Sequence, residues 1–425
     1  MVSADAVCDL QAPNAEAGAK LAQSEGCISE SSTLPESEGQ VTSASALSEV
    51  SDDGKSCASS EPQRIPPFAE DGTPQDFHWT TQAVSHSRRR RLILEKHPEI
   101  EQLYGYSLLE GVVGVATTLL NLYIGFKIVQ LQLGWPAVLL AMAVVSGTIN
   151  HSLFLAMHEA SHMLVFPRRW MNDIFAIFTN LSMGTPAAIS FTRYHLDHHV
   201  YTGVDVLDPD IPTEIEGRLF TTPLGKFIFV LLFPLTYTLR PMLRCPKKLC
   251  FMEVINWTVV VAWDLFVYKT LGWKGIAYFV GGAFFSMSFH PLNGHLIAEH
   301  YQFPEGEKLQ ETYSTYGWEN LLTFNAGYHL EHHDFPRVPG CLLPKVHQIA
   351  KEFYDLPHHT TWVRVVWDFI MKKEVNPYSR VKRVAIRGGE IPFPHQQFVA
   401  DEKKDLGAYW CEFNKTQANE TKKAK

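Results

Sequence analysis

The sequence predicts an all-α integral membrane protein with four transmembrane helices and further helices at the membrane interface. One observation behind this prediction is a set of four apolar stretches, each close to the length of about 20 residues that a bilayer crossing needs. They comprise residues 108–133, 137–157, 255–271 and 276–296. The other observation is that eight of the 19 histidines fall in three short clusters beside these stretches. Together these two observations predict a membrane domain with a histidine-rich site at one end.

Composition divides the chain into four regions. Residues 1–70 are rich in Ser and Glu and poor in large apolar residues, so we expect a disordered tail that cannot bury a core. A basic cytosolic segment at 71–107 contains four consecutive arginines from Arg88, interpreted as an anchor at the membrane surface. A membrane domain at 108–380 and a cytosolic tail at 381–425 complete the chain. Nothing in the sequence indicates nucleic-acid binding.

Targeting signals and cysteines suggest the compartment. The first residues lack the apolar core of a signal peptide, and the seven scattered cysteines form no CxxC pair. These features are typical of a reducing compartment without a disulfide framework. The last residues, Lys422-Lys423-Ala424-Lys425, fit a retrieval signal. We therefore expect a multi-pass protein of the endoplasmic reticulum membrane.

The histidine clusters restrict the topology, because they must lie on one side of the membrane to form one site. The stretch at 171–189 carries Pro186 and several polar residues, and the stretch at 227–239 carries Pro234. Both are therefore predicted to stay at the interface without crossing. Four crossings then leave both termini on the histidine side. Linkers rich in Lys and Arg predict that this side is cytosolic.

The three clusters have the spacing of neighbours on a helix. They are His158 with His162, His195 with His198 and His199, and His329 with His332 and His333. Residues three and four apart lie one above the other, so the imidazoles of one cluster can point the same way. One such pair is often only a buried histidine pair, but three predict a metal site for iron, zinc or copper. Eight ligands exceed the needs of one ion and indicate two.

Polar residues near the clusters are candidates to orient the imidazoles. A metal-bound histidine usually donates its second ring N–H to a carboxylate, carbonyl or water. The candidates are Glu159, Asp197, His295 and Glu331. Asp205, Asp208 and Asp210 either play the same part for the second cluster or cap the segment that follows it.

The order and spacing of the clusters resemble the histidine boxes of the membrane fatty-acid desaturase and hydroxylase superfamily. Flanking strings make the chain similar to the sphingolipid (dihydroceramide) 4-desaturase family over about residues 76–380. These strings are Asp76-Phe77-His78-Trp79, Asp208-Pro209-Asp210-Ile211-Pro212-Thr213, Ala298-Glu299-His300-Tyr301 and Glu331-His332-His333-Asp334-Phe335-Pro336. One departure is Met163, because the family usually has Asn directly after the first box. A hydrogen bond near the site is then missing or supplied elsewhere.

The resemblance implies a cytosolic cap of histidine boxes that holds two Fe²⁺ ions, with no catalytic residue beyond the metal ligands. The expected ligands are His158, His162, His195, His198, His199, His329, His332 and His333. A ninth ligand is expected near the end of the fourth apolar stretch, where His290, His295 and His300 compete. His300 is preferred, then His295, because its separation from His329 is similar to that of the corresponding ligand in stearoyl-CoA desaturases.

The resemblance further implies an O₂-dependent oxidoreductase. It would insert a trans double bond between C4 and C5 of the sphinganine chain of dihydroceramide, giving ceramide. The sequence contains no His-Pro-Gly-Gly haem segment, so electrons are expected from a separate cytochrome b5 and its NADH-dependent reductase. Alternatives are a C4-hydroxylase that forms phytoceramide, or an enzyme that does both. A histidine-rich metal transporter is the non-enzyme alternative, but transporters hold their ligands near the bilayer midplane.

Overall fold

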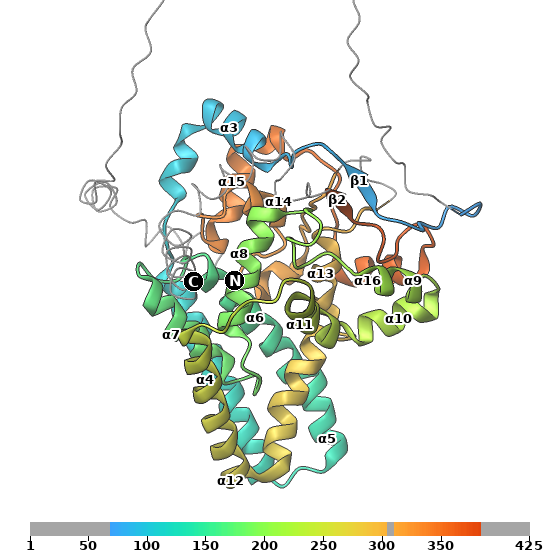
Figure 1. Cartoon of the computed structure of the whole chain (residues 1–425). Helices are drawn as coiled ribbons and strands as arrows, with labels where there is room; N and C mark the ends of the chain where they lie inside the picture. The colour runs from blue at the N-terminus through green and yellow to red at the C-terminus, as the bar shows by residue number, and fades with distance from the viewer. Residues whose placement is uncertain (1–68, 304–309, 384–425) are drawn as a thin grey trace, which may run out of the picture. The chain divides into compact units, whose positions relative to one another are not determined.

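The computed structural model describes residues 69–303 and 310–383. Most of the two predicted tails, residues 1–68 and 384–425, lies outside this range, as does the predicted retrieval signal. The described chain is mainly helical, which confirms the predicted class. Its apolar helices extend downward in Figure 1, and a cap of shorter helices and loops lies above them.

Within the described residues, three helices are long and apolar enough to cross a membrane. The first is α4 (Leu108–Gln130). The second runs through α5 (Trp135–Leu140), the π-helical turn η3 (Ala141–Ser146) and α6 (Gly147–Ser161). The third is α12 (Phe251–Met287). It ends before residue 296, the predicted end of the last stretch, because Pro291 begins a 3₁₀ turn, η4 (Pro291–Gly294).

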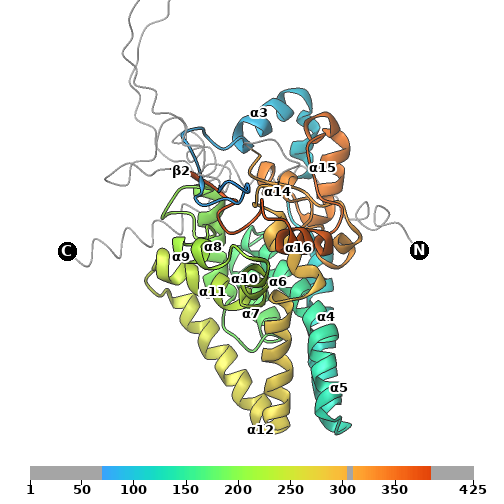
Figure 2. The same cartoon turned by 90° about the vertical axis from the view of Figure 1, so that its right-hand side faces the viewer.

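Helix α12 consists of two arms rather than one rod. Gly272 has φ 64° and ψ −164°, a conformation that breaks the helix and that glycine adopts without steric cost. Figures 1 and 2 show the two arms meeting at the end of the molecule opposite the cap. The Lys274 ammonium donates to the Leu133 carbonyl oxygen at 2.8 Å, so this turn contacts the turn between α4 and α5. The arms correspond to the third and fourth predicted spans.

The apolar helices pack through glycines and expose large side chains. A Cβ atom on Gly114 would lie 2.5 Å from the Phe175 ring, and one on Gly125 would lie 2.5 Å from the Phe279 ring. Val112 of α4 is 65% exposed. Small residues at helix contacts and apolar side chains outside are typical of helices surrounded by lipid.

The two stretches predicted not to cross form short or bent helices. Helix α7 (Arg169–Asn180) has 12 residues, too few for a crossing. A turn separates it from α8 (Ala188–Tyr201). Helices α10 (Pro223–Leu231) and α11 (Phe233–Arg244) are bent by 75° relative to each other, so they form a broken or re-entrant element.

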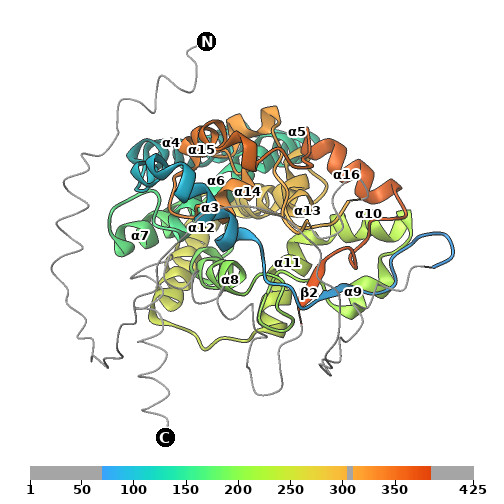
Figure 3. The ribbon, with the colours of Figure 1, turned by 90° about the horizontal axis from the view of Figure 1, so that it is seen from above.

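The cap combines the segment before α4, the segment at 214–219 that follows α8, and the chain after α12. Its helices are α3 (His86–Lys96), η2 (Pro98–Leu103), α9 (Glu214–Leu219), α13 (His295–Ala298), η5 (Trp318–Leu322), α14 (His329–Asp334), η6 (Gly340–Leu342), α15 (Leu343–Ile349), η7 (Lys351–Phe353) and α16 (Trp362–Met371). Strand β1 (His78–Thr80) pairs in parallel with β2 (Val381–Arg383), with His78 opposite Val381. Figure 3 looks down on the cap, where α3 lies against α14.

Candidate metal centre

Four parts of the fold bring nine predicted ligands together. The end of α6 carries the first histidine cluster, α8 the second and α14 the third, and His300 follows α13. All nine side chains are buried except His162, which is partly buried. Because α8 and α14 are separate in the chain, only their tertiary packing closes the site.

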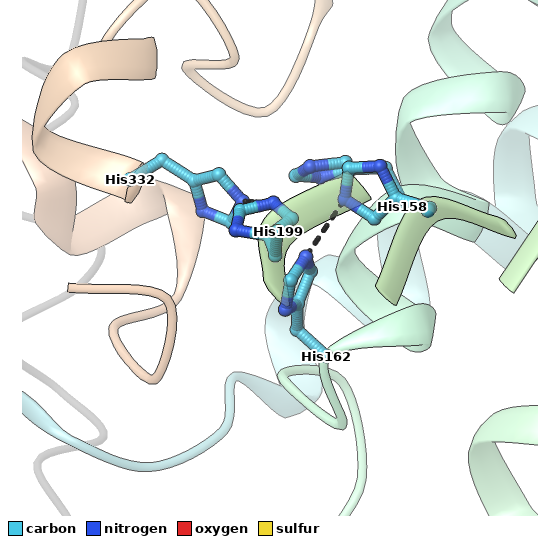
Figure 4. Close-up of side chains that lie close together, drawn as sticks. His158, His162, His199 and His332 are labelled. Atoms are coloured by element: carbon cyan, nitrogen blue, oxygen red, sulfur yellow. Dashed lines mark hydrogen bonds between the residues drawn. The ribbon is translucent and has the colours of Figure 1, made fainter. Parts of the chain in front are cut away.

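Five histidines form what we call the first group. Their ring nitrogens, one from each, all lie within 4.8 Å of one another. The members are His158, His162, His195, His199 and His332. Figure 4 shows the four labelled rings converging from different segments of the chain. Nε2 of His162 lies 2.8 Å from Nε2 of His195, and Nε2 of His332 lies 3.2 Å from Nε2 of His199.

The remaining four histidines form the second group. Ring nitrogens of His198, His300 and His333 lie within 4.8 Å of one another. Nε2 of His329 lies 2.9 Å from Nε2 of His300, which in turn lies 2.9 Å from Nε2 of His198. The two groups adjoin, because the rings of His199 and His333 stack with their centroids 4.1 Å apart.

Both groups have the geometry that a bound metal requires. Metal–imidazole bonds of about 2.1 Å place neighbouring ligand nitrogens about 3 Å apart, close to the separations between these Nε2 atoms. Nε2 of His333 is buried and has no hydrogen-bond partner among the described residues. A buried polar atom without a partner is costly, and a metal ion would satisfy it. The residues present therefore fit two metal ions.

Outer polar contacts orient three rings of the second group. Nδ1 of His198 lies 2.9 Å from Oδ1 of Asp208, and Nδ1 of His329 lies 3.3 Å from Oε1 of Glu299. Nδ1 of His300 lies 3.1 Å from a backbone carbonyl oxygen. With the proton on Nδ1, each ring turns its Nε2 lone pair toward the other members of the group, as a metal ligand must.

The first group has fewer outer contacts. Nδ1 of His158 lies 3.1 Å from Oε1 of Glu159, the carboxylate predicted for this purpose. Nδ1 of His162, His199 and His332 is buried without a partner among the described residues. Ring packing surrounds these three side chains, with the centroids of His162 and His199 4.5 Å apart.

Burial keeps most of these imidazoles neutral. It lowers the pKa of His195, His199, His332 and His333 well below the usual value near 6.5, and neighbouring histidines lower it further. His198 differs: burial lowers its pKa, but the Asp208 carboxylate outweighs this effect and raises it. Neutral imidazoles are the form that binds a metal.

Three other predicted orienting residues lie elsewhere. Asp197 pairs with Lys247 at 2.6 Å instead of with a box histidine. Glu331 accepts from Ser314, Tyr316 and His347, so it holds the third box helix to the surrounding chain rather than orienting a box ring. His295 packs against His151 and Trp362, and its Nε2 is 4.0 Å from Oε1 of Glu299, too far for a hydrogen bond.

The basic segment ahead of α4 covers the third box. Nδ1 of His86 lies 2.7 Å from Oδ1 of Asp334, and the Arg89 guanidinium donates to both carboxylate oxygens of Asp334, at 2.5 and 3.0 Å. The His86 ring also stacks on His333 at 4.9 Å. The interpretation of the arginine run as a surface anchor was therefore wrong for Arg89 and Arg90, which contact Asp334.

The departure after the first box has a backbone explanation. Met163 has a φ of 61°, in the left-handed region where Asn is favoured over most other side chains. The Asn expected there from the family resemblance thus suits the conformation of the chain, independently of any hydrogen bond to the metal site.

Comparisons with known proteins agree with this geometry. A family model described as "Fatty acid desaturase" matches residues 133–365, and one described as "Sphingolipid Delta4-desaturase (DES)" matches residues 73–109. A Drosophila melanogaster protein named sphingolipid delta(4)-desaturase DES1 is 47% identical over 314 residues, which cover 72% of this chain and 95% of the relative. The chain belongs to the sphingolipid Δ4-desaturase family. This assignment confirms the predicted resemblance and makes the protein an oxidoreductase.

Two further relatives carry the same name. The Homo sapiens protein is 45% identical over 314 residues, with 73% of this chain and 95% of the relative covered. The Bos taurus protein is 44% identical over 322 residues, with 75% and 97% covered. The match at 73–109 includes His86 and Arg89, so in this desaturase the segment that packs on the third box lies within the family-specific match.

Proposed function

We propose that this desaturase introduces a trans double bond between C4 and C5 of the sphinganine chain of a dihydroceramide. The observation that carries this proposal is an apolar cavity of about 410 Å³ whose lining includes His195 and His198, one proposed ligand from each histidine group. A lipid chain in this cavity would lie next to both groups. The names of the relatives supply the substrate class.

The cavity walls suit a hydrocarbon chain. Side chains from α6, α8, α11, the second arm of α12 and the turn between α7 and α8 line it, including Phe154, Met157, Met183, Phe284 and Met287. Apolar walls exclude water from the carbons that react, and a fixed chain keeps those carbons within reach of the site.

Nine histidines would hold two iron ions. The first group would bind one ion through His158, His162, His195, His199 and His332. The second group would bind the other ion through His198, His300, His329 and His333. Bound iron would supply the activation of O₂ that removal of hydrogen from an unactivated C–H bond needs. The protein's own part is to keep most of the imidazoles neutral by burial and to orient His198 and His329 through Asp208 and Glu299. We propose cytochrome b5, reduced by its NADH-dependent reductase, as the electron donor.

We further propose four crossings, with each arm of α12 as one, and with the cap and both termini on the cytosolic side of the endoplasmic reticulum membrane. Exposed positions allow a test with single cysteines. Arg168 lies between the first and second clusters, Arg218 follows the second, and Gln132 lies in the turn between α4 and α5. Cysteines at 168 and 218 should react from the cytosol, and one at 132 only from the lumen. Reaction of position 218 from the lumen alone would refute the shared site.

Lipid profiling of a host that lacks its own sphingolipid desaturase tests the reaction. Cells that express the full chain should accumulate ceramide with a C4–C5 trans double bond, and cells that express His332→Ala should not. If phytoceramide is the sole product, the reaction is C4-hydroxylation and not desaturation. Metal uptake without any lipid product would favour a transporter, although the histidine groups lie in the cap and not midway along the apolar helices.

A further inference from the structure

We propose that Asp210 and Tyr237 bind the hydroxyl group next to the reacting carbons of the lipid and thereby select which carbons are oxidised. This role rests on the proposed function, because it assumes that an N-acyl sphinganine occupies the apolar cavity. Both residues line that cavity together with His195 and His198.

Few polar groups in the cavity wall are available to a ligand. The hydroxyl groups of Ser190, Thr238 and Ser286 donate to other protein oxygens at 2.7–2.8 Å. By contrast, the Tyr237 hydroxyl has no hydrogen bond to a described residue, and the Asp210 carboxylate has only an ion pair through Oδ2. The Asp210 carboxylate and the Tyr237 hydroxyl are therefore open to a bound molecule, and the hydroxyl groups of Thr185 and Tyr194 lie in the same wall.

Asp210 lies close to the second histidine group. Its backbone N–H donates to Oδ1 of Asp208 at 2.9 Å, and the same oxygen lies 2.9 Å from Nδ1 of His198. The guanidinium of Arg380 lies 2.9 Å from Oδ2 of Asp210, so this ion pair occupies one carboxylate oxygen. Oδ1 of Asp210 is left as a hydrogen-bond acceptor, and the backbone of this residue is linked to the ligand His198 by two hydrogen bonds through Asp208.

Tyr237 is held on the same wall as Asp210. Its ring stacks on Phe233 with the centroids 5.7 Å apart and meets the Phe154 ring edge-on at 6.5 Å. Arg240, three residues later in α11, donates to the backbone carbonyl oxygen of Asp210 at 3.0 Å. Residues three apart share a helix face. The same face of α11 therefore carries Tyr237 and, through Arg240, binds the backbone of Asp210.

The position of these groups matches one kind of lipid. In an N-acyl sphinganine the hydroxyl group on C3 is directly attached to the neighbour of C4, so a polar anchor beside the ligands would place C4 and C5 at the site. A lipid that is oxidised far from its head group would instead need its polar anchor far from the ligands. Asp210 would accept the hydrogen of the C3 hydroxyl, and Tyr237 would donate to its oxygen.

The test compares N-octanoyl sphinganine with its 3-deoxy analogue in microsomes that contain the full-length protein. Tyr237→Phe should lower kcat/KM for the parent lipid about tenfold, as expected for one lost hydrogen bond in a buried site, mainly by raising KM. For the 3-deoxy analogue the variant should equal the wild type within about twofold, because the missing hydroxyl has already removed the contact. Asp210→Asn should show the same dependence on substrate.

Tyr123→Phe is the matched control, since Tyr123 is 59% exposed on α4 and lies outside the cavity. Equal losses on both lipids, or no loss on either, would overturn the role. Iron content equal to that of the wild type shows that a variant has folded. If neither variant accumulates, the wild-type protein is measured with both lipids. Equal kcat/KM values for the parent lipid and the 3-deoxy analogue would overturn the role of Asp210 and Tyr237 but not the proposed function. Turnover of neither lipid would overturn the proposed function as well.

Discussion

The two histidine groups differ in what holds their rings in place. In the second group, Asp208, Glu299 and a backbone carbonyl oxygen face the outer nitrogens of His198, His329 and His300. In the first group only one ring, that of His158, has such a partner among the described residues. The other rings of the first group are positioned by their backbone and by packing against one another.

From this difference we expect that the two proposed metal ions would be held with unequal strength. Outer hydrogen bonds fix the tautomer and the direction of a ring before the metal arrives, so less ordering is left for binding. Packing positions a ring less strictly, because a ring can still rotate about its own bonds. We therefore expect the second group to retain its metal better than the first.

The largest expected effect is the loss of one ligand from either group. His198→Ala or His332→Ala should lower ceramide formation at least about a thousandfold, because each removes a nitrogen that converges on a metal position. Product analysis and iron content measure the result. His358→Ala, an exposed histidine outside both groups, should retain activity. Normal turnover by either ligand variant would contradict the two-metal assignment.

Removal of an outer contact tests the comparison directly. Asp208→Asn should weaken the second metal position about 10- to 100-fold, because His198 loses the charged acceptor of its ring N–H. Iron titration should then show the first group filling before the second, the reverse of the wild type. Asp205→Asn is the control, since Asp205 pairs with Arg244 instead. Simultaneous weakening of both positions would mean that the groups do not fill independently.

The segment that covers the third box offers a third test. Arg89→Met removes the bidentate partner of the buried Asp334 and should destabilise the protein by about 3 kcal/mol. The melting temperature should fall, and the second group should lose iron because His86 and Asp334 no longer hold α14 firmly. Arg88→Met, at an exposed neighbour, should leave both measurements unchanged. Equal behaviour of the two variants would show that the segment does not support the site.

A smaller and opposite effect is expected beside the first group. Met163→Asn should raise the stability by about 0.5–1 kcal/mol, because Asn adopts the left-handed backbone conformation of this position at lower cost. If packing alone places His162, the variant should also slow the loss of iron from the first group to a chelator. Met163→Ala serves as the comparison and should bring no gain in stability.

The smallest effect is expected from the N-terminal tail. Removal of residues 1–65 should leave turnover within about twofold of the full chain, because their composition offers no core and every box lies beyond them. Turnover is compared at equal amounts of membrane-inserted protein. A large loss of turnover would show that the tail contributes to the site or to substrate access.

The helical membrane class, the family and the convergence of the boxes could be predicted from the sequence. Apolar length is a local property, so the stretches that became α4, α6 and the arms of α12 were visible directly. The gap at 272–275 between the last two apolar stretches also marked the break within α12, where Gly272 takes a positive φ. Helical spacing likewise showed that each box could present its rings on one face.

Only the tertiary structure decided which histidine joins which group. His198 and His199 are adjacent in the chain, yet they belong to different groups because neighbours on a helix diverge by about 100°. The sequence did not identify the outer partners of the rings either. Asp208 was one of three candidate carboxylates, and Glu299 was not among the residues proposed. Asp197, which is closer in the chain, pairs with Lys247 instead. A ring nitrogen and its acceptor come into contact because distant segments pack together. The spacing of residues along the chain does not predict that packing.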